Sequence, residues 1–184
     1  ISMGGLLRKL HENGNRITVA YQTSGNVAVF DHEVRRYLDF IRRADHVLGV
    51  GDGDFERVAE RIERALAGKR PGDVDIDEVR ELKRAIRETE AVSALESLGL
   101  DPRSARFLDM PFYRTGSVRK APVGEEDRRI VVDLLDETRP ALVFAAGDLS
   151  DPHGTHRQCL ESVRAGLERW EGEVPEVWLY RGAW

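Results

Sequence analysis

Residues 140–156 read PALVFAAGDLSDPHGTH, an apolar run that passes directly into a polar loop. The run over 141–146 is short and continuous, which predicts a strand buried on both faces, as in a parallel sheet. Open parallel α/β sheets bind their ligands at the carboxyl ends of the strands. We therefore expect the chemistry of this protein in the loop over 147–156.

Helical and strand patterns alternate along the rest of the chain. Apolar residues at helical spacing predict helices over about 2–13, 31–41, 55–68, 75–98, 125–138 and 159–167. β-branched and aromatic runs predict strands over 16–21, 105–110, 141–146 and 177–180. This alternation predicts an α/β fold, with a three-layer, Rossmann-like, mostly parallel sheet and helices on both faces. Because the sequence opens with a helix, we expect the first strand of that sheet to precede Ile1.

Several polar residues are expected to mark the starts of helices. Ser2 and Asp31 precede helical patterns and are expected to cap them. Asp75 is followed three residues later by Glu78, the spacing of a capping box. Residues 49–54, GVGDGD, follow no predicted strand, so we interpret them as a turn rather than a phosphate-binding loop.

The composition excludes several classes of protein. The chain has 184 residues, which suits one domain with a sizeable core and does not suit two independent ones. Its 28 Lys and Arg against 33 Asp and Glu give a net charge of −5, which argues against nucleic-acid binding. No apolar run approaches the roughly 18 residues that span a membrane, and the first residues lack a signal-peptide pattern. The single cysteine, Cys159, excludes an internal disulfide and fits a reducing, cytoplasmic location.

Two histidines, His153 and His156, lie three residues apart where the polar loop meets a helix. Imidazoles at this spacing can converge on one face and suit zinc and similar metals. Asp148 and Asp151 are placed to orient their ring nitrogens. The alternative is an ordinary helix start, in which Asp151 or Thr155 is only a cap. Two histidines alone do not complete a zinc site.

Other residues point to structure rather than to chemistry. Cys159 falls on the apolar stripe of its helix and is expected in the core rather than as a nucleophile. Glu90 interrupts the apolar stripe of the helix over 75–98, and a buried carboxylate needs a partner. Arg87, one turn earlier, is the nearest candidate for that ion pair.

Taken together, these segments resemble the LmbE-like, or PIG-L, family of zinc-dependent N-deacetylases. Residues 87–99 are similar to the family's pattern R-x-x-E-x-x-x-A-x-x-x-L-G, and residues 107–111, FLDMP, stand where the family has a short strand and substrate loop. Residues 153–156, HGTH, resemble its second metal motif, His-Pro-Asp-His. The resemblance covers nearly the whole chain, which implies one domain over 1–184. Within the family, the chain is most similar to a subgroup described as glucosamine-6-phosphate deaminase-like.

The resemblance implies roles for particular residues. His156 would bind zinc, His153 would act in catalysis, and Arg87 would contact the substrate. Thr155 stands where the family has an aspartate, so Asp148 or Asp151 would take over as partner of the first histidine. The family's first motif, His-Pro-Asp-Asp, which supplies two further zinc ligands and a general base, is absent from these 184 residues. The domain is therefore expected to be incomplete at its N-terminal end.

The implied reaction is zinc-dependent removal of the acetyl group from an N-acetylated amino sugar, such as an N-acetylglucosamine derivative, with release of acetate. The implied ligand is a small amino-sugar substrate. The implied protein partner is either a second copy of the chain or a fused or associated sugar-phosphate deaminase domain. Neither nucleic acid nor a membrane is expected as a partner. Two alternatives stay open. One is a non-catalytic α/β domain associated with a glucosamine-6-phosphate deaminase, and the other is a metal-independent sugar-phosphate deaminase or isomerase.

Overall fold

The computed structural model describes residues 3–49, 53–148 and 150–181. The chain divides into two compact units, and each is described by itself. Unit 1 consists of Ile1–Ser24 and Glu90–Trp184, and unit 2 consists of Gly25–Thr89. The expected cap at Ser2 and most of the expected turn over 49–54 lie outside the described residues.

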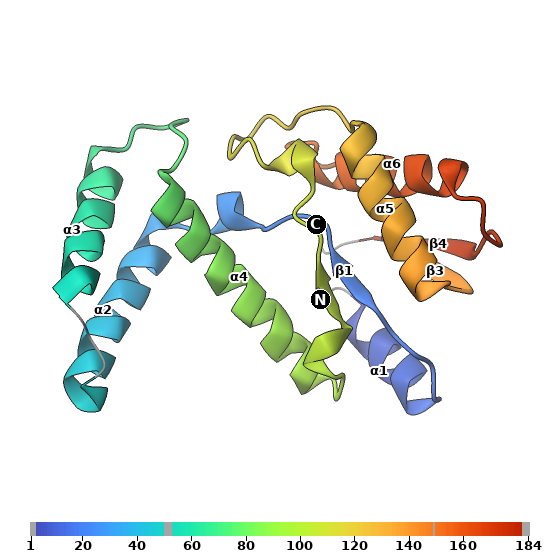
Figure 1. The fold of residues 1–184 in the computed structure, drawn as a ribbon, viewed down its shortest axis with the longest axis horizontal. Coiled ribbons are helices and arrows are strands. Elements are labelled where there is room, and N and C mark those ends of the chain that lie inside the picture. The colour runs from blue at the N-terminus through green and yellow to red at the C-terminus, as the bar shows by residue number, and fades with distance from the viewer. Residues whose placement is uncertain (1–2, 50–52, 149, 182–184) are drawn as a thin grey trace. The chain divides into compact units, whose positions relative to one another are not determined.

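Unit 1 contains the strands and the helices that follow them (Figure 1). Its elements are α1 (Gly4–Glu12), β1 (Val19–Tyr21), the end of α4 (Asp77–Ser97), β2 (Ala105–Phe107), α5 (Glu125–Thr138), β3 (Leu142–Ala146), α6 (Thr155–Arg169) and β4 (Glu176–Tyr180). Single 3-10 turns, η2 (Pro102–Ser104) and η3 (Pro111–Tyr113), lie on either side of β2. The order agrees with the predicted alternation of helices and strands.

All strand pairing in the described part of unit 1 is parallel. β1 pairs with β2, with Val19 opposite Ala105, and β3 pairs with β4, with Leu142 opposite Glu176. Parallel strands joined through helices are the signature of an α/β fold. The predicted fold class is therefore confirmed.

The first two strands are shorter than predicted. The ladder of β1 and β2 covers three residues on each strand, although Leu108 N still donates to Tyr21 O at 2.9 Å. Asp109 then takes a φ of 45°, a left-handed conformation that ends the extended backbone. Asp109 thus ends a strand that the sequence pattern continued to residue 110.

Helices α5 and α6 pack closely on each other. A Cβ at Gly166 of α6 would lie 2.4 Å from Val131 Cγ1 of α5, so only glycine allows this approach. At the end of α6, Trp170 Nε1 donates to Asp136 Oδ1 of α5 at 2.9 Å. This packing holds α6, whose first turn carries His156, against the rest of unit 1.

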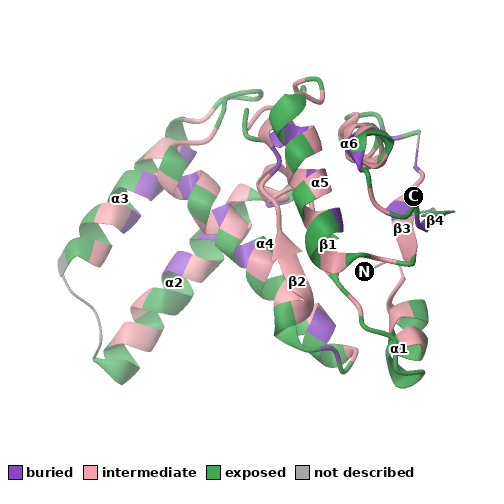
Figure 2. Cartoon of the chain, turned by 45° about the vertical axis from the view of Figure 1, so that its right-hand side comes forward, coloured by how far each residue is buried: buried purple, intermediate pink, exposed green. Residues whose placement is uncertain are grey.

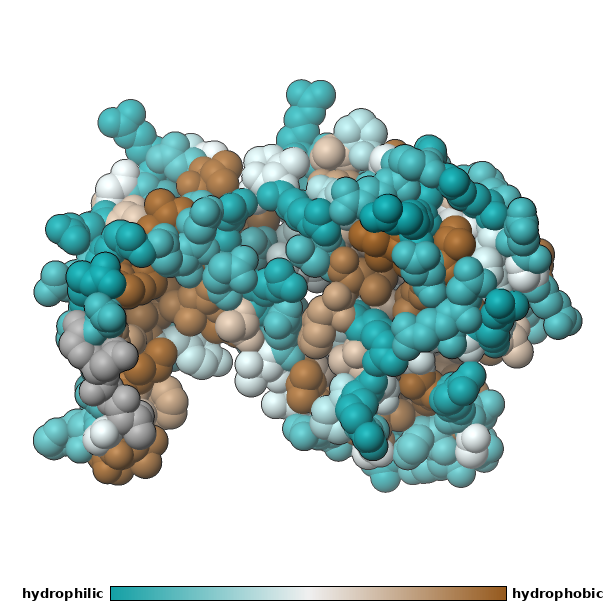
Figure 3. Space-filling model, in the orientation of Figure 1, coloured by the Kyte–Doolittle hydropathy of each residue, from teal (hydrophilic) through white to brown (hydrophobic). Residues whose placement is uncertain are grey.

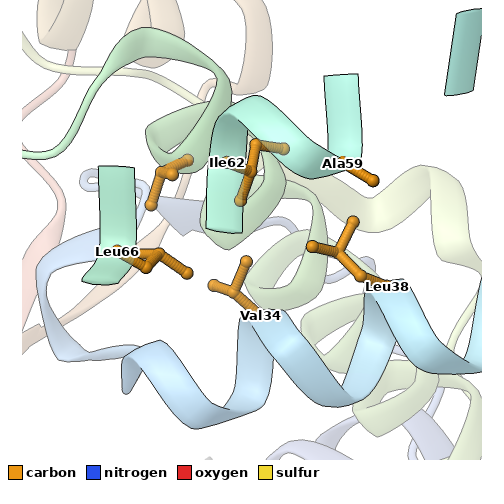
Figure 4. Close-up of a cluster of buried hydrophobic side chains, with 6 residues drawn as sticks. Val34, Leu38, Ala59, Ile62 and Leu66 are labelled. Carbon is orange, nitrogen blue, oxygen red and sulfur yellow. The ribbon is translucent and has the colours of Figure 1, made fainter. Parts of the chain in front are cut away.

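Unit 2 is helical, with η1 (Asn26–Ala28), α2 (Asp31–Leu48), α3 (Gly53–Gly68) and the first part of α4. Buried positions on α2 and α3 alternate with exposed ones along each helix (Figure 2). Figure 4 shows the side chains of these two helices meeting in one apolar cluster. The buried members of the cluster are Val34, Leu38, Ala59, Ile62, Leu66 and Val79.

A buried ion network replaces the helix caps predicted at Asp31 and Asp75. Lys83, only 2 % exposed, places Nζ 2.6 Å from Asp31 Oδ1 and 2.8 Å from Asp75 Oδ2. Lys69 Nζ lies 2.5 Å from Asp75 Oδ1 and 3.1 Å from Asp31 Oδ1. Both cap predictions are wrong, because the two lysines bind these carboxylates while α2 begins at Asp31 itself and α4 begins at Asp77.

The structure corrects one expectation about side-chain burial and shows an exposed apolar surface on α2. Glu90 is exposed on α4 rather than buried on its apolar stripe. Large apolar side chains are also exposed near the C-terminal end of α2, where Figure 3 shows apolar atoms at the surface; they are Phe40, Val47 and Leu48. No helix in the described ranges is long and apolar enough to cross a membrane.

Candidate functional site

The segment after β3 is held tightly from its first residue. Gly147 N donates to Tyr180 O of β4 at 2.8 Å, and a Cβ at position 147 would lie 2.9 Å from Leu179 Cβ. The next described side chain, Asp148, is only 5 % exposed. The polar loop therefore begins inside the protein, at the carboxyl end of the strand, as the sequence predicted.

Asp151 organises the backbone of the histidine segment. Its Oδ1 accepts from His153 N at 3.0 Å and its Oδ2 accepts from His156 N at 2.8 Å. Gly154, between the histidines, has a φ of 72°, and α6 starts at the next residue. Asp151 therefore accepts from an amide in the first turn of α6, although the N-cap residue of the helix is Gly154. We expected it to orient ring nitrogens, whereas both of its oxygens accept from backbone amides.

These contacts also set the charge state of Asp151. Burial by itself raises the pKa of the carboxyl group. The backbone amides of His156 and His153 and the nearby imidazoles act in the other direction and prevail, so the pKa lies below the ordinary 3.8. Asp151 is thus a fixed negative charge at the start of α6, where the helix dipole favours one.

The two histidine side chains have different environments. His153 is exposed, whereas His156 is half-buried and its Nδ1 is shielded from solvent. An exposed imidazole can exchange protons with a substrate, and a half-buried one is held in one orientation. This difference agrees with separate roles for the two rings.

Asp148 carries a carboxylate oxygen that lacks a protein donor. Its Oδ1 accepts weakly from Ser150 N at 3.4 Å, while its Oδ2 is buried without a hydrogen bond from any described residue. A buried carboxylate oxygen left unsatisfied costs on the order of 1–3 kcal/mol. Asp148 is therefore suited to receive a cation or a donor from a ligand.

A zinc ion needs more ligands than these residues provide. Structural and catalytic zinc sites use three or four protein ligands. Within the ranges the structure describes, no group of three or more His, Cys, Asp or Glu side chains converges on one point. His156 and Asp148 are suitable in kind, but the described residues fit only part of a zinc shell.

Residues from other elements also belong to this region of unit 1. Ser162 of α6 donates to Gln22 Oε1 at 2.6 Å, and Gln22 O in turn accepts from Met110 N at 2.9 Å. Gln22 directly follows β1, so the carboxyl end of β1 is joined to the helix that carries His156. No sequence pattern predicts the Ser162–Gln22 contact, which spans 140 positions.

Lys120 is a further residue that the sequence reasoning missed. Burial lowers the pKa of its ammonium group, while the negative charge of Asp151 acts against that shift. Asp151 is thus within electrostatic range of Lys120. No spacing in the sequence relates position 120 to position 151, so only the fold reveals this proximity.

Cys159 is half-buried on α6 rather than fully in the core. Burial, with a contribution from the charge of Asp151, raises the pKa of its thiol to about 12. A thiol with such a pKa is protonated at neutral pH and does not act as a nucleophile.

Arg87, the expected substrate contact, belongs to unit 2. A Cβ at Gly25 would lie 3.2 Å from Arg87 Nε, and Gly25 has a φ of 67°. Both the close contact and the left-handed backbone favour glycine at this position. Arg87 is thus held against the η1 turn of its own unit. Its role toward the substrate stays a prediction.

Comparison with known proteins agrees with this arrangement. Residues 1–167 match the PIG-L family, described as GlcNAc-PI de-N-acetylase. A Bacteroides thetaiotaomicron protein named as glucosamine-6-phosphate deaminase-like is 43 % identical over 192 residues, covering 100 % of this chain and 29 % of that protein. The chain thus spans less than a third of that relative's length, and no solved structure matches it. The match over 1–167 confirms the resemblance: the chain belongs to the PIG-L family of de-N-acetylase-like hydrolases.

Proposed function

We propose that this chain is part of a zinc-dependent hydrolase that removes the acetyl group from an N-acetylated amino sugar and releases acetate. The observation that supports the proposal is the histidine segment at the carboxyl end of β3, which Asp151 fixes through two backbone amides. A binding surface would not require a backbone that is preorganised at both histidines. Catalysis gains from it, because a site that is already ordered needs no rearrangement during the reaction.

Each residue of the segment has a proposed task. His156, half-buried, would supply one zinc ligand, and the exposed His153 would donate a proton to the leaving amine or to the tetrahedral oxyanion. Asp148, with its unsatisfied oxygen, would accept a hydrogen bond or hold a cation beside the imidazoles. When zinc is bound, it supplies a water molecule of lowered pKa.

The remaining ligands are part of the proposal. The family resemblance assigns them to a His-Pro-Asp-Asp motif, which does not occur in the 184 residues. The described donors alone do not complete a zinc site. The same observation favours a second candidate function, a non-catalytic α/β domain that accompanies a sugar-phosphate deaminase. The name of the Bacteroides relative supports such a partner, as does its greater length.

An activity assay separates the two candidates. Full-length protein is incubated with N-acetylglucosamine and its 6-phosphate, with zinc and with a chelator, and acetate is measured. We expect release that requires the metal, and a loss of about 100-fold or more in His156→Ala. His11→Ala is the matched control, since His11 is exposed on α1 of the same unit. Wild-type protein that releases no acetate with zinc present would favour the non-catalytic domain.

Two further features of the proposal concern the protein's surroundings. A cytoplasmic location remains a prediction from the single cysteine. Association with a second copy or with a deaminase domain also remains a prediction, and sedimentation of the full-length protein measures it directly.

A further inference from the structure

The loop that joins η3 to α5 is clamped at both ends by one carboxylate. Asp127, 2 % exposed, accepts from Phe112 N at 3.1 Å through Oδ1 and from Gly124 N at 2.8 Å through Oδ2. Ala121 N also donates to Phe112 O at 3.1 Å. The backbone between residues 112 and 124 is therefore preorganised rather than a free surface loop.

The tip of this loop presents Lys120 in a defined position. Its Nζ donates to Ser117 O at 2.7 Å and lies 4.0 Å from the centroid of the buried Tyr113 ring. Ser117 Oγ donates to Arg119 O at 2.7 Å, which closes the turn beneath the lysine. A carbonyl and an aromatic face hold the ammonium group in place, and two of its three N–H groups are not used by these hydrogen bonds.

Lys120 forms no ion pair with the residues that the structure describes. No carboxylate of the described residues forms a salt bridge with it, although Asp151 acts on it from a distance. Asp151 is already bound by two backbone amides. A half-buried ammonium group with spare donors is suited to bind an anionic group, because partial burial strengthens its attraction for a negative charge.

We propose that Lys120 binds the phosphate group of a phosphorylated amino-sugar substrate, with the sugar directed toward the histidine segment. This rests on the proposed function, which places an amino sugar at His153 and His156. A phosphate monoester carries close to two negative charges and accepts several hydrogen bonds, which matches an ammonium group with two free donors. Lys120 is thus a specificity-determining residue rather than a catalytic one.

Chemical footprinting of the full-length protein tests the proposal at the residue itself. Lys120 is acetylated with an amine-reactive ester, and the rate is followed by mass spectrometry, with the exposed Lys9 as internal reference. Glucosamine 6-phosphate, which has no acetyl group to lose, is expected to slow the modification of Lys120 about tenfold at saturation while Lys9 is unaffected. Glucosamine and inorganic phosphate, at the same concentration, are expected to protect much less.

Each result of the footprinting experiment either supports or overturns phosphate binding by Lys120. Protection by glucosamine equal to that by its phosphate would overturn recognition of the phosphate group. Equal protection by inorganic phosphate would show an anion site without a sugar, and no protection would remove Lys120 from the site. Because the probe cannot be deacetylated, protection without any acetate release would leave this inference standing and overturn the proposed reaction instead.

Variants provide the second measurement. Lys120→Gln is expected to raise KM for N-acetylglucosamine 6-phosphate about tenfold or more, with kcat/KM for unphosphorylated N-acetylglucosamine unchanged. Lys120→Arg retains the charge and is expected to recover most of the affinity. Arg119→Gln is the matched control, because it removes the same charge from the exposed neighbouring residue. An equal effect of Lys120→Gln on both substrates would overturn the phosphate assignment.

Discussion

Asp127 shows how one buried side chain can order a loop of a dozen residues. Its carboxylate is the acceptor for Phe112 N and Gly124 N, and both amides would be left unsatisfied without it. Asp127→Ala is therefore expected to lower the free energy of unfolding by about 3 kcal/mol. Urea denaturation measures this loss. Asp133→Ala, exposed on the same helix, should change stability by less than about 0.5 kcal/mol, and equal losses in the two variants would refute the clamp.

Cys159 allows a prediction about reactivity. Burial and the charge of Asp151 raise the pKa of its thiol from 9.0 to about 12. Only the thiolate attacks a disulfide reagent, so at pH 8 the native thiol should react about a thousandfold more slowly than in denaturant. The colorimetric reaction with an aromatic disulfide measures both rates. Rapid modification of the native protein would contradict the buried, protonated thiol.

At the residue scale, the sequence predicted the histidine pair because both residues lie within one short segment. It also allowed Asp151 as a cap, since caps are local. It could not show Lys120, because the side chains that surround this residue come from separate segments of the chain. Long-range placement depends on the fold, and sequence spacing records only local geometry.

Helix α2 contains a matched pair of leucines that tests the core of unit 2. Leu38 is 3 % exposed in the apolar cluster, and Leu48 is 67 % exposed at the end of the same helix. Leu38→Ala should lower the free energy of unfolding by about 2–5 kcal/mol, because it removes buried methyl groups and leaves a cavity. Leu48→Ala should change it by less than about 0.5 kcal/mol. Similar losses in the two variants would mean that α2 is buried differently.

The ion network of unit 2 predicts a pH dependence. Burial raises the pKa of Asp31, but hydrogen bonds from Lys83 and Lys69 outweigh burial, so the pKa lies below its usual 3.8. A carboxyl with a depressed native pKa stabilises the fold above its unfolded pKa, and this contribution disappears as the pH falls through the native value. Asp31→Asn should therefore reduce stability at pH 7.

The same variant should lose less stability on acidification. Unfolding is measured in urea from about pH 6 to about pH 3 for wild type, Asp31→Asn and Asp39→Asn. Asp39 lies on the same helix but is well exposed, so its variant should follow the wild-type curve. An Asp31→Asn curve parallel to wild type would show that Asp31 is not the group that titrates.

At the element scale, the positions of the helices were predicted better than the residues that cap them. Periodicity located α5 within the bounds that the structure has, Glu125–Thr138. Asp31 and Asp75 have the residue type of caps, yet each is bound by lysines of other segments. Local preference for a cap contributes about 1 kcal/mol, so partners brought by the tertiary fold can override it.

For the whole molecule, the α/β class followed from alternation, and the division into two compact units did not. The alternation of helices and strands can be recognised from local sequence patterns. The boundary between the two units cannot, because it falls inside a single continuous helix, α4. Val79 and Ile86 of α4 are buried in the part that belongs to unit 2, and Leu95 is buried in the part that belongs to unit 1. No glycine or proline interrupts α4 between them.

Because α4 is shared by both units, the prediction of a single domain over 1–184 can be tested by unfolding. All three tryptophans, Trp170, Trp178 and Trp184, belong to unit 1, so tryptophan fluorescence reports that unit, while far-UV circular dichroism reports the helices of both units. If the chain unfolds as one domain, the two transitions should coincide in wild-type protein.

Thr89→Pro, at the unit boundary within α4, should lower stability by about 3 kcal/mol or more and separate the two transitions. Thr89→Ala is the control, because alanine only removes the bond from Thr89 Oγ1 to Ala85 O and favours the helix. Wild-type transitions that already differ would show two domains, and their order would tell which unit supports the other.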